Sequence, residues 1–491
     1  MTSKIDNNKI IITNPISDDK VGMLELCTPS KFEYIINIAK EYNDWADLNI
    51  NQRCIQINKF RRAILKNRME LQAVLISETG KKDFDAFTEL FSTLEHLREI
   101  TKIAKKSLKK NKRNPGILKN KKAYVQYEPL GIAGIISPWN YPLVTPATTI
   151  SEALITGNNV ILKPSEHTPL IMQYLKKIWD DSTSYKNAFQ VIYGDADVGQ
   201  MLVESNNVDI ICFTGSTAVG KKIARKCAKT LKPIILELGG KDPMIVLKDA
   251  NQRRAIEAAI FGGLNNAGQA CISIEQVFVE HEIFNEFTNK ISNKIEQLTA
   301  GNTDADLIGA IITPENCTKI NEHLSELDNS TKIIMGQKQN HNMFIAPTIV
   351  IDPPSDSKIV NEETFGPVIL LRPFNTEIDL LEKIHKTGYG LSGSIFGKDK
   401  KRINKIIKKI KTGTMSINDV FSHYGIASLP FGGEGISGVG RLHGKEGLYS
   451  FCRVKSIVES KYRFIDDPWW FNRTKKIEAI LKKAISFLYR W

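Results

Sequence analysis

Hydrophobic positions recur every three or four residues between Lys31 and Leu108. This spacing places them on one face of a helix, so we expect the segment to be mostly helical. Residues 110–122 are polar and contain Pro115 and Gly116, and residues 123–128 alternate between apolar and polar side chains. Alternation is typical of a half-exposed strand, so residues 110–128 are predicted to form a projecting arm.

Beyond residue 130 the pattern changes to short apolar runs separated by helical periodicity. The first series covers residues 132–136, 159–163, 189–194 and 209–214. A second series, after Asp242, covers residues 244–247, 276–279, 333–335 and 394–396. Such runs are typical of buried parallel strands covered by helices on both faces. The sequence therefore predicts an α/β protein with two doubly wound domains, which bind ligands at the carboxyl ends of their strands.

Composition and charge argue against several classes of protein. The 491 residues include no run of 18 apolar side chains, and the N-terminus lacks the apolar core of a signal peptide. The seven cysteines are scattered, odd in number and without a C-x-x-C pair, which favours a reducing cytoplasm. The eight histidines show no metal-ligand spacing, so we expect no metal. The net charge of +13 comes without a nucleic-acid recognition motif, which favours a solvated lysine-rich surface.

Two turns that follow predicted strands suit a nucleotide. The segment Gly215–Gly220 opens a helix, where backbone N–H groups and the helix dipole attract phosphate. The G-x-G-x-x-G fingerprint is absent, and Lys222 stands where a P-loop needs a hydroxyl. Lys163 and Glu166 can bind ribose hydroxyls, and the Glu166 carboxylate disfavours a 2′-phosphate, which favours NAD over NADP. Taken alone, each turn fits a plain strand-to-helix connection better.

Three side chains combine into a candidate reaction site. Cys271 ends the glycine-rich stretch 261–271, Glu237 lies in an apolar run that stops at a glycine pair, and Asn140 lies between two prolines. A thiol can act as a nucleophile, a carboxylate as a base and a rigid amide as an oxyanion donor. The alternatives are a buried structural cysteine, a surface acid and an asparagine that caps its own turn.

Taken in their order along the chain, these motifs resemble those of the aldehyde dehydrogenase superfamily. The resemblance extends from about Ile35 to Val458. The shared motifs are Pro-Trp-Asn, Lys-Pro-Ser-Glu, Phe-Thr-Gly-Ser, Leu-Glu-Leu-Gly-Gly-Lys, Gly-Gln-x-Cys, Glu-x-Phe-Gly-Pro and Pro-Phe-Gly-Gly. The resemblance implies a homodimer or homotetramer. It also implies three parts: a Rossmann-like NAD-binding domain (1–109 and 129–237), a catalytic domain (238–430) and a β oligomerisation arm and strand (110–128 and 451–460).

The resemblance also implies roles for individual residues. Cys271 is the implied nucleophile, Glu237 the general base and Asn140 an oxyanion donor. The implied cofactor is NAD, with NADP as the alternative. Its implied contacts are Lys163, Glu166, Trp139, Gly215, Ser216, Glu363 and Phe365. The implied reaction oxidises a small-molecule aldehyde to the carboxylic acid, through a thiohemiacetal and a thioester on Cys271 and without acyl transfer to coenzyme A. Because a free cysteine has a pKa of about 8.5, we expect the site to favour the thiolate.

A narrower resemblance concerns the substrate. Asn418-Asp-Val420, His423 and the segment 440–445 resemble the fatty and aromatic aldehyde branch, the class 3-like enzymes. This branch implies a medium- or long-chain aliphatic aldehyde. The alternatives are a semialdehyde dehydrogenase that acts on charged substrates and a catalytically idle binding or scaffold protein of the same fold.

Residues 465–491 form an amphipathic, basic tail. Trp469 and Trp470 precede apolar residues spaced by three and four, namely Ile477, Ile480, Leu481, Ala484, Leu488 and Trp491. Basic residues lie beside them: Lys475, Lys476, Lys482, Lys483 and Arg490. The pattern fits an anionic membrane surface or a helix docked on its own oligomer. We expect a cytoplasmic protein that associates reversibly with the inner face of a membrane.

Overall fold

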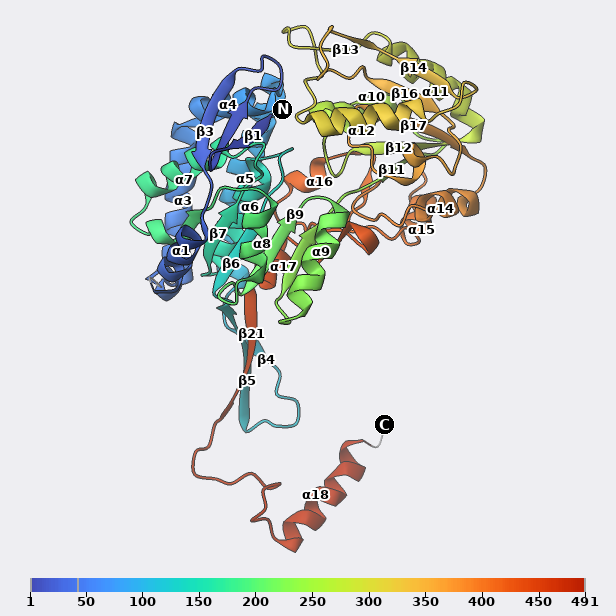
Figure 1. Cartoon of the computed structure of the whole chain (residues 1–491). Coiled ribbons are helices and arrows are strands. Elements are labelled where there is room, and N and C mark those ends of the chain that lie inside the picture. Colours follow the sequence, from blue (N-terminus) through green and yellow to red (C-terminus); the bar gives the residue numbers. More distant parts are fainter. Residues whose placement is uncertain (1, 42–43, 490–491) are drawn as a thin grey trace. The chain divides into compact units, whose positions relative to one another are not determined.

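The computed structural model describes residues 2–41 and 44–489. Its contacts divide the chain into two units. The large unit contains the residues before Lys109 together with Glu128–Arg453, and the small unit contains Lys109–Tyr127 and the residues from Val454 on. The large unit holds two sheets with helices against their faces (Figure 1). The predicted α/β class is therefore confirmed.

The first sheet has six strands in the order β20-β10-β9-β6-β7-β8. Neighbours are parallel except β20, which runs antiparallel to β10. The strands are β6 (Ile132–Ile136), β7 (Asn159–Lys163), β8 (Phe189–Val191), β9 (Ile210–Thr214), β10 (Ile234–Glu237) and β20 (Gly438–Val439). Strand order reverses between β6 and β9, and a crevice opens at the carboxyl ends of parallel strands at such a point.

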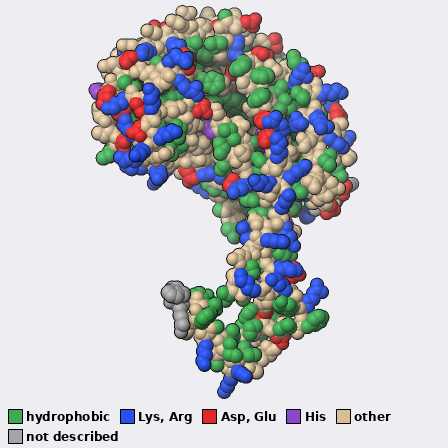
Figure 2. All heavy atoms as spheres, turned by 180° about the vertical axis from the view of Figure 1, so that it is seen from behind, with side chains coloured by type: hydrophobic (Ala, Val, Ile, Leu, Met, Phe, Trp, Pro, Cys, Tyr) green, Lys and Arg blue, Asp and Glu red, His purple; other side chains and the backbone are tan. Residues whose placement is uncertain are grey.

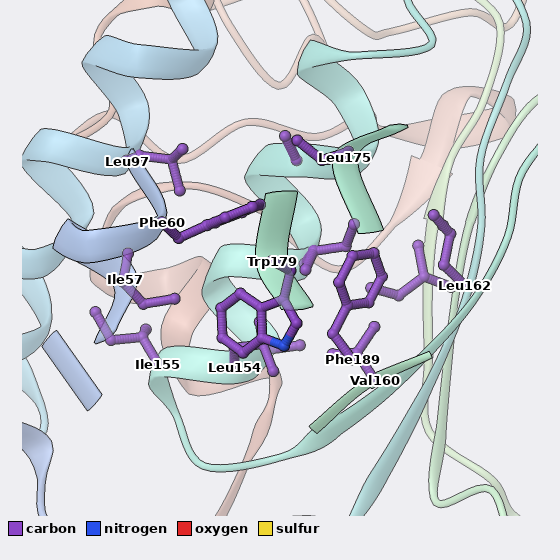
Figure 3. Close-up of a cluster of buried hydrophobic side chains, with 14 of the residues drawn as sticks. Ile57, Phe60, Leu97, Leu154, Ile155, Val160, Leu162, Leu175, Trp179 and Phe189 are labelled. Carbon is purple, nitrogen blue, oxygen red and sulfur yellow. The ribbon is translucent and has the colours of Figure 1, made fainter. Parts of the chain in front are cut away.

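Helices cover this sheet and carry most of its core. They are α1 (Pro29–Glu41), α2 (Asp44–Asp47), α3 (Ile50–Lys66), α4 (Arg68–Thr79), α5 (Asp83–Ser107), α6 (Val144–Ile155), α7 (Leu170–Ser182), α8 (Ala196–Glu204), α9 (Thr217–Ala228) and α17 (Gly444–Ser450). Trp179 of α7 lies at the centre of the cluster in Figure 3, with its ring 5.2 Å from the ring of Phe60 and 6.3 Å from that of Phe189. These edge-on aromatic contacts join α3, α7 and the sheet into one core.

The second sheet has seven strands in the order β14-β16-β17-β12-β11-β18-β19. Its strands are β11 (Asp242–Val246), β12 (Ile274–Glu280), β14 (Lys332–Met335), β16 (Thr348–Ile351), β17 (Val368–Phe374), β18 (Ser394–Phe396) and β19 (Ser416–Ile417). Only the edge strand β14 pairs antiparallel. The neighbouring helices are α10 (Gln252–Leu264), α11 (His281–Ile295), α12 (Pro314–Ser325), α13 (Lys358–Asn361), α14 (Glu377–His385), α15 (Lys400–Ile407) and α16 (Ser422–Gly425).

Short elements complete the large unit. Near the N-terminus lie three antiparallel strands that the hydrophobic pattern did not predict, β1 (Ser3–Asp6), β2 (Lys9–Thr13) and β3 (Lys20–Glu25). Two further strands, β13 (Thr299–Ala300) and β15 (Gln337–Lys338), pair with each other. The 3₁₀ turns are η1 (Lys186–Ala188), η2 (Asn265–Gly268) and η3 (Gly435–Ser437).

The small unit is built on a three-stranded sheet in the order β21-β5-β4. Its strands are β4 (Asn111–Arg113), β5 (Lys121–Pro129) and β21 (Cys452–Ser460). Helix α18 (Lys475–Leu488) follows, and none of its residues is buried. The predicted apolar stripe and basic flank extend to Trp491 and Arg490, which lie outside the described residues. Among the described helices, none has the length and apolar composition that a membrane span needs.

Candidate active site

A cavity of about 470 Å³ lies where loops of the two sheets of the large unit face each other. It brings together most of the residues predicted from the sequence: Cys271, Glu237, Asn140, Trp139, Gly215, Ser216, Glu363 and Phe365. Lys163 and Glu166 do not line it. Residues far apart in the chain thus converge on one hollow at the ends of β6, β9 and β10.

The loop before Cys271 has an unusual backbone. Asn266, Ala267 and Gly268 have consecutive positive φ values of 51°, 55° and 72°. For residues other than glycine, such conformations cost about 1–3 kcal/mol each and cluster at functional sites. A side chain at Gly268 would come 2.0 Å from the carbonyl oxygen of Gly366, so only glycine fits there. The glycine-rich stretch is therefore required for the chain to turn sharply and present the thiol.

Asn140 is buried and tied to the same loop. Its Nδ2 donates to the carbonyl oxygen of Gln269 at 2.9 Å, and its own carbonyl accepts from Asn266 Nδ2 at 3.1 Å. Glu89 of α5 holds the following residues, because its carboxylate accepts the backbone N–H groups of Leu143 and Val144 at 2.7 and 3.0 Å. The amide is thus fixed beside the cysteine from two sides.

Glu237 ends β10 and is only 3% exposed, so the alternative of a surface acid is wrong. Both its carboxylate oxygens are buried without a hydrogen-bond partner in the described part of the chain. Burial raises the pKa of the Glu237 carboxyl well above its ordinary value, Arg441 acts in the opposite direction, and Glu152 adds to the rise. Gly432 leaves room for the carboxylate, since a Cβ there would lie 2.9 Å from Oε1.

The surroundings of Cys271 favour the protonated thiol. Burial raises the pKa of the Cys271 thiol well above its ordinary value, and the nearby carboxyl groups of Asp242, Glu363 and Glu237 raise it further. This differs from the expectation that the site favours the thiolate. The physical reason is first the burial of the sulfur, which deprives a thiolate of hydration, and second the acids that face it, since a carboxylate next to a thiol disfavours another negative charge. The proton therefore has to leave in the step in which the sulfur attacks.

This environment predicts a pH dependence. Because the thiolate is the reactive form and the pKa of Cys271 is raised, its thiolate fraction at neutral pH is below that of a free cysteine. We expect alkylation of Cys271 by iodoacetamide to accelerate with rising pH and to keep rising above pH about 8.5, the ordinary pKa of a cysteine. Peptide mass spectrometry measures the rate, with N-acetylcysteine as the reference. A rate that levels off at or below that pH would contradict the raised pKa.

Two turns of the first sheet, one after β7 and one before α9, have the chemistry to hold a dinucleotide. Lys163 Nζ pairs with Glu166 Oε2 at 2.9 Å at the end of β7. Ser216 caps α9 and accepts the backbone N–H of Val219 at 3.4 Å, and Gly215 precedes it on the cavity wall. A helix N-terminus with a serine cap attracts phosphate, and an acid beside a lysine can bind ribose hydroxyls.

The loop that carries Glu363 and Phe365 is held from the second sheet. Glu363 Oε1 accepts the backbone N–H of Gly240 at 3.0 Å. Burial raises the pKa of Glu363 to about 7. The ring of Phe365 lies 5.5 Å from that of Trp139, edge to face. Glu275 accepts the N–H of Phe365 at 2.9 Å, so a buried acid of β12 fixes the backbone at this position.

Several of these supporting residues were not predicted. Glu275, Glu89 and Lys319 stand in strand or helix patterns where a charge usually faces water. Glu275 pairs with the buried Lys241, and Glu89 pairs with Lys81 at 2.6 Å. The one usable signal is that Glu275 directly precedes the strand pattern of residues 276–279; nothing in the sequence marks Glu89 or Lys319, which line the cavity.

Behind the cavity, three potential metal ligands come together. The ligand atoms of His96, Glu152 and His443 all lie within 4.8 Å of one another, and all three residues are buried. Glu152 already accepts the backbone N–H of His443 on both oxygens, at 3.0 and 3.2 Å. Burial lowers the pKa of each histidine to about 3, which keeps both imidazoles neutral. These contacts describe a polar cluster within the core, and the absence of a metal stays a prediction.

Fold and site together define a class: an α/β protein in which a thiol, a buried carboxylate and the glycine turn before α9 meet at one cavity. A family model described as "Aldehyde dehydrogenase family" matches residues 2–457. The chain therefore belongs to the aldehyde dehydrogenase family.

The individual relatives differ in the aldehyde substrate for which they are named. A putative succinate-semialdehyde dehydrogenase [NADP(+)] of Mycobacterium bovis is 30% identical over 446 residues, which cover 89% of this chain and 86% of the relative. A 4,4′-diapolycopene aldehyde oxidase of Methylomonas is 29% identical over 448 residues, covering 91% and 84%. The crystal structure of betaine aldehyde dehydrogenase of Staphylococcus aureus in complex with NAD+ superposes with a TM-score of 0.88, at 28% identity and covering 95% and 94%.

Proposed function

We propose that the protein oxidises an uncharged medium- or long-chain aliphatic aldehyde to its carboxylic acid with NAD as hydride acceptor. The observation that carries the proposal is the single cavity shared by Cys271, Glu237 and Asn140, whose remaining walls are largely apolar. The resemblance to the fatty and aromatic aldehyde branch supports the same substrate class. Glu237 supports hydrolysis as the final step, because a buried carboxylate can activate water.

In the proposed mechanism the Cys271 sulfur bonds to the aldehyde carbon, the carbonyl π electrons move to the oxygen, and the thiol proton passes to solvent water. The developing oxyanion accepts hydrogen bonds from Asn140 Nδ2 and the Cys271 backbone N–H, and one such donor contributes about 3 kcal/mol. When bound, NAD supplies the acceptor for the hydride that this carbon loses. Glu237 then takes a proton from water, the water oxygen bonds to the thioester carbon, and the carbon–sulfur bond breaks to release the acid and restore the thiol.

The residues present fit a nicotinamide dinucleotide. A Cβ at Gly215 would lie 2.5 Å from the ring of Phe213, so glycine keeps this turn tight and lets a phosphate approach the N-terminus of α9. We propose that Lys163 and Glu166 hold the adenosine ribose, that Trp139, Gly215 and Ser216 line the pyrophosphate, and that Glu363 and Phe365 contact the nicotinamide end. Glu166 favours NAD, although the mycobacterial relative is named for NADP.

The cavity walls support an apolar substrate. Beyond Cys271 they include Val144, Phe261, Ile272, Val420 and Phe421. No arginine is among the described residues that line the cavity. Its one lysine is Lys319, which lies near enough to Glu363 to lower the pKa of that carboxyl and so belongs to the proposed cofactor end.

A semialdehyde dehydrogenase is the second candidate, because the mycobacterial relative carries that name. A carboxylate-bearing substrate needs a cation in its binding site, since burying an unpaired charge is unfavourable. In this chain Lys319 would have to serve both the substrate carboxylate and the cofactor end.

A panel of aldehydes separates the candidates. We expect NADH formation with hexanal and decanal, with kcat/KM rising with chain length and with succinate semialdehyde far less active. Each substrate is measured with NAD and with NADP, and NAD is expected to be preferred. A higher kcat/KM for succinate semialdehyde would overturn the proposed substrate class. No turnover of any aldehyde would support an idle binding protein of the same fold.

We also propose that β5 and β21 of the small unit form an interface between copies of the chain, giving a homodimer or homotetramer. The exposed side chains along β21 support this, because an open strand edge and face are suited to pair with another chain.

The tail supports a further proposal, reversible binding to an anionic membrane. Figure 2 shows hydrophobic side chains next to Lys and Arg on the small unit. We expect deletion of residues 471–491 to abolish sedimentation with phosphatidylserine-containing vesicles, while aldehyde oxidation by the cavity is retained. Wild-type binding should weaken with added salt, because exposed charges are screened. A charge-reversal variant, Lys475→Glu with Lys476→Glu, keeps the apolar face and should bind these vesicles more weakly than the wild type. Undiminished binding of the deletion variant would refute the proposal.

A further inference from the structure

An aromatic ridge lies on the surface of α5 beside the cavity. It consists of Phe84, Phe87 and Phe91, which are 64%, 47% and 58% exposed. Neighbouring rings contact each other, with centroids 6.0 and 6.3 Å apart. Phenylalanine side chains of a soluble protein are usually buried, and adjacent exposed rings of this kind mark a binding surface.

The aromatic ridge is continuous with the cavity wall. Thr88, Glu89 and Ser92 of the same helix line the cavity. In a helix, residues three or four positions apart are neighbours on the surface, so Phe84 and Phe91 lie next to the lining residue Thr88. The aromatic ridge thus borders the part of the cavity wall that α5 forms.

Other elements at the cavity wall extend the apolar surface. Phe261 of α10 lines the cavity, remains half exposed and packs its ring 5.8 Å from that of Phe421. Ile426, exposed, follows the lining residue Gly425, and α16 packs against α5. Glu89 carries a charge on this wall, but its pairing with Lys81 neutralises it. Figure 2 shows hydrophobic side chains beside a hollow in the surface of the large unit.

We propose that the aromatic ridge is a distal subsite for the far end of a long apolar aldehyde whose carbonyl lies at Cys271. The inference rests on the proposed function and extends it. The cavity selects an apolar aldehyde, and the ridge raises the preference for chains long enough to leave the cavity. A short aldehyde never reaches the ridge, whereas a long one buries its terminal methylenes against the three rings, which is favourable because apolar surface leaves water.

The test compares the wild type with a variant that carries Phe84→Ser, Phe87→Ser and Phe91→Ser. Because these side chains are exposed, the variant keeps the core. We expect kcat/KM for hexanal to stay unchanged and kcat/KM for hexadecanal to fall at least tenfold, which corresponds to about 1.4 kcal/mol of lost binding. Ile378→Ser, an exposed apolar position on α14, is the matched control and should change neither value.

A binding measurement keeps this test independent of turnover. Calorimetry with hexadecan-1-ol, which has no aldehyde group, should give a Kd at least tenfold weaker for the triple variant and an unchanged Kd for hexan-1-ol. Equal affinities of wild type and variant for hexadecan-1-ol would overturn the distal subsite even if aldehydes are oxidised. A variant that changes only the oligomeric mass in size-exclusion chromatography would overturn it as well, since the ridge would then contact a second copy. Absence of hexanal oxidation combined with the expected alcohol binding would reject the proposed function and leave the subsite standing.

Discussion

Cys271→Ala is expected to abolish aldehyde oxidation while NAD still binds. Without the thiol no thiohemiacetal can form, and removal of a nucleophile typically lowers kcat by several orders of magnitude. The substitution leaves the residues proposed to bind NAD in place, since none of them depends on the sulfur for a hydrogen bond. NADH formation from decanal measures the loss, and calorimetry measures NAD binding.

Cys27→Ala is the control for this substitution. Cys27 is also buried but lies between β3 and α1 and does not line the cavity. Its replacement should leave turnover near the wild-type value. Near-wild-type turnover of Cys271→Ala would contradict the assignment of Cys271 as the nucleophile. Loss of NAD binding in that variant would show that the substitution had damaged the fold of the site.

Glu237→Gln is expected to separate the two halves of the reaction. Glutamine has nearly the same shape but cannot accept a proton from water, and general-base catalysis typically contributes about 10²–10⁴-fold. The thioester should therefore form and then accumulate, which gives a burst of NADH followed by a slow steady state. Added hydroxylamine, which cleaves a thioester without a base, should restore part of the steady-state rate.

Stopped-flow absorbance measures the burst and the steady state of this variant. A steady state undiminished from the wild type would exclude Glu237 as the base. Loss of both the burst and the steady state would mean that Glu237 already acts when the sulfur attacks, and hydroxylamine would then restore nothing.

The sequence predicted the α/β sheets, and it marked candidate site residues that the structure brings to one cavity, because these signals are local. Runs such as residues 159–163 are typical of buried strands, and glycines before Cys271 and after Glu237 mark sharp turns. The strands β1 to β3 were missed because they are short and partly exposed, so their pattern resembles that of a loop. Whether a segment becomes such a strand depends on partners that only the tertiary structure supplies.

Buried charge pairs also could not be predicted from the sequence. The sequence pattern around Glu89 and Lys81 is that of solvent-exposed residues near the start of a helix. In the structure both side chains are buried and paired with each other. Their burial follows from the packing of α5 against the Asn140 loop, which no local pattern encodes. The same holds for the pKa of Cys271, because the acids that raise it come from distant segments, including Asp242 and Glu363.

The most direct test of the account is to trap the acyl-enzyme. Glu237→Gln is mixed with decanal and NAD, quenched in acid and digested, and the peptides are analysed by mass spectrometry. The proposed mechanism predicts a decanoyl thioester on the peptide that contains Cys271 and no such adduct when NAD is omitted. A decanoyl group on another cysteine, or NADH formation without any adduct on Cys271, would contradict it.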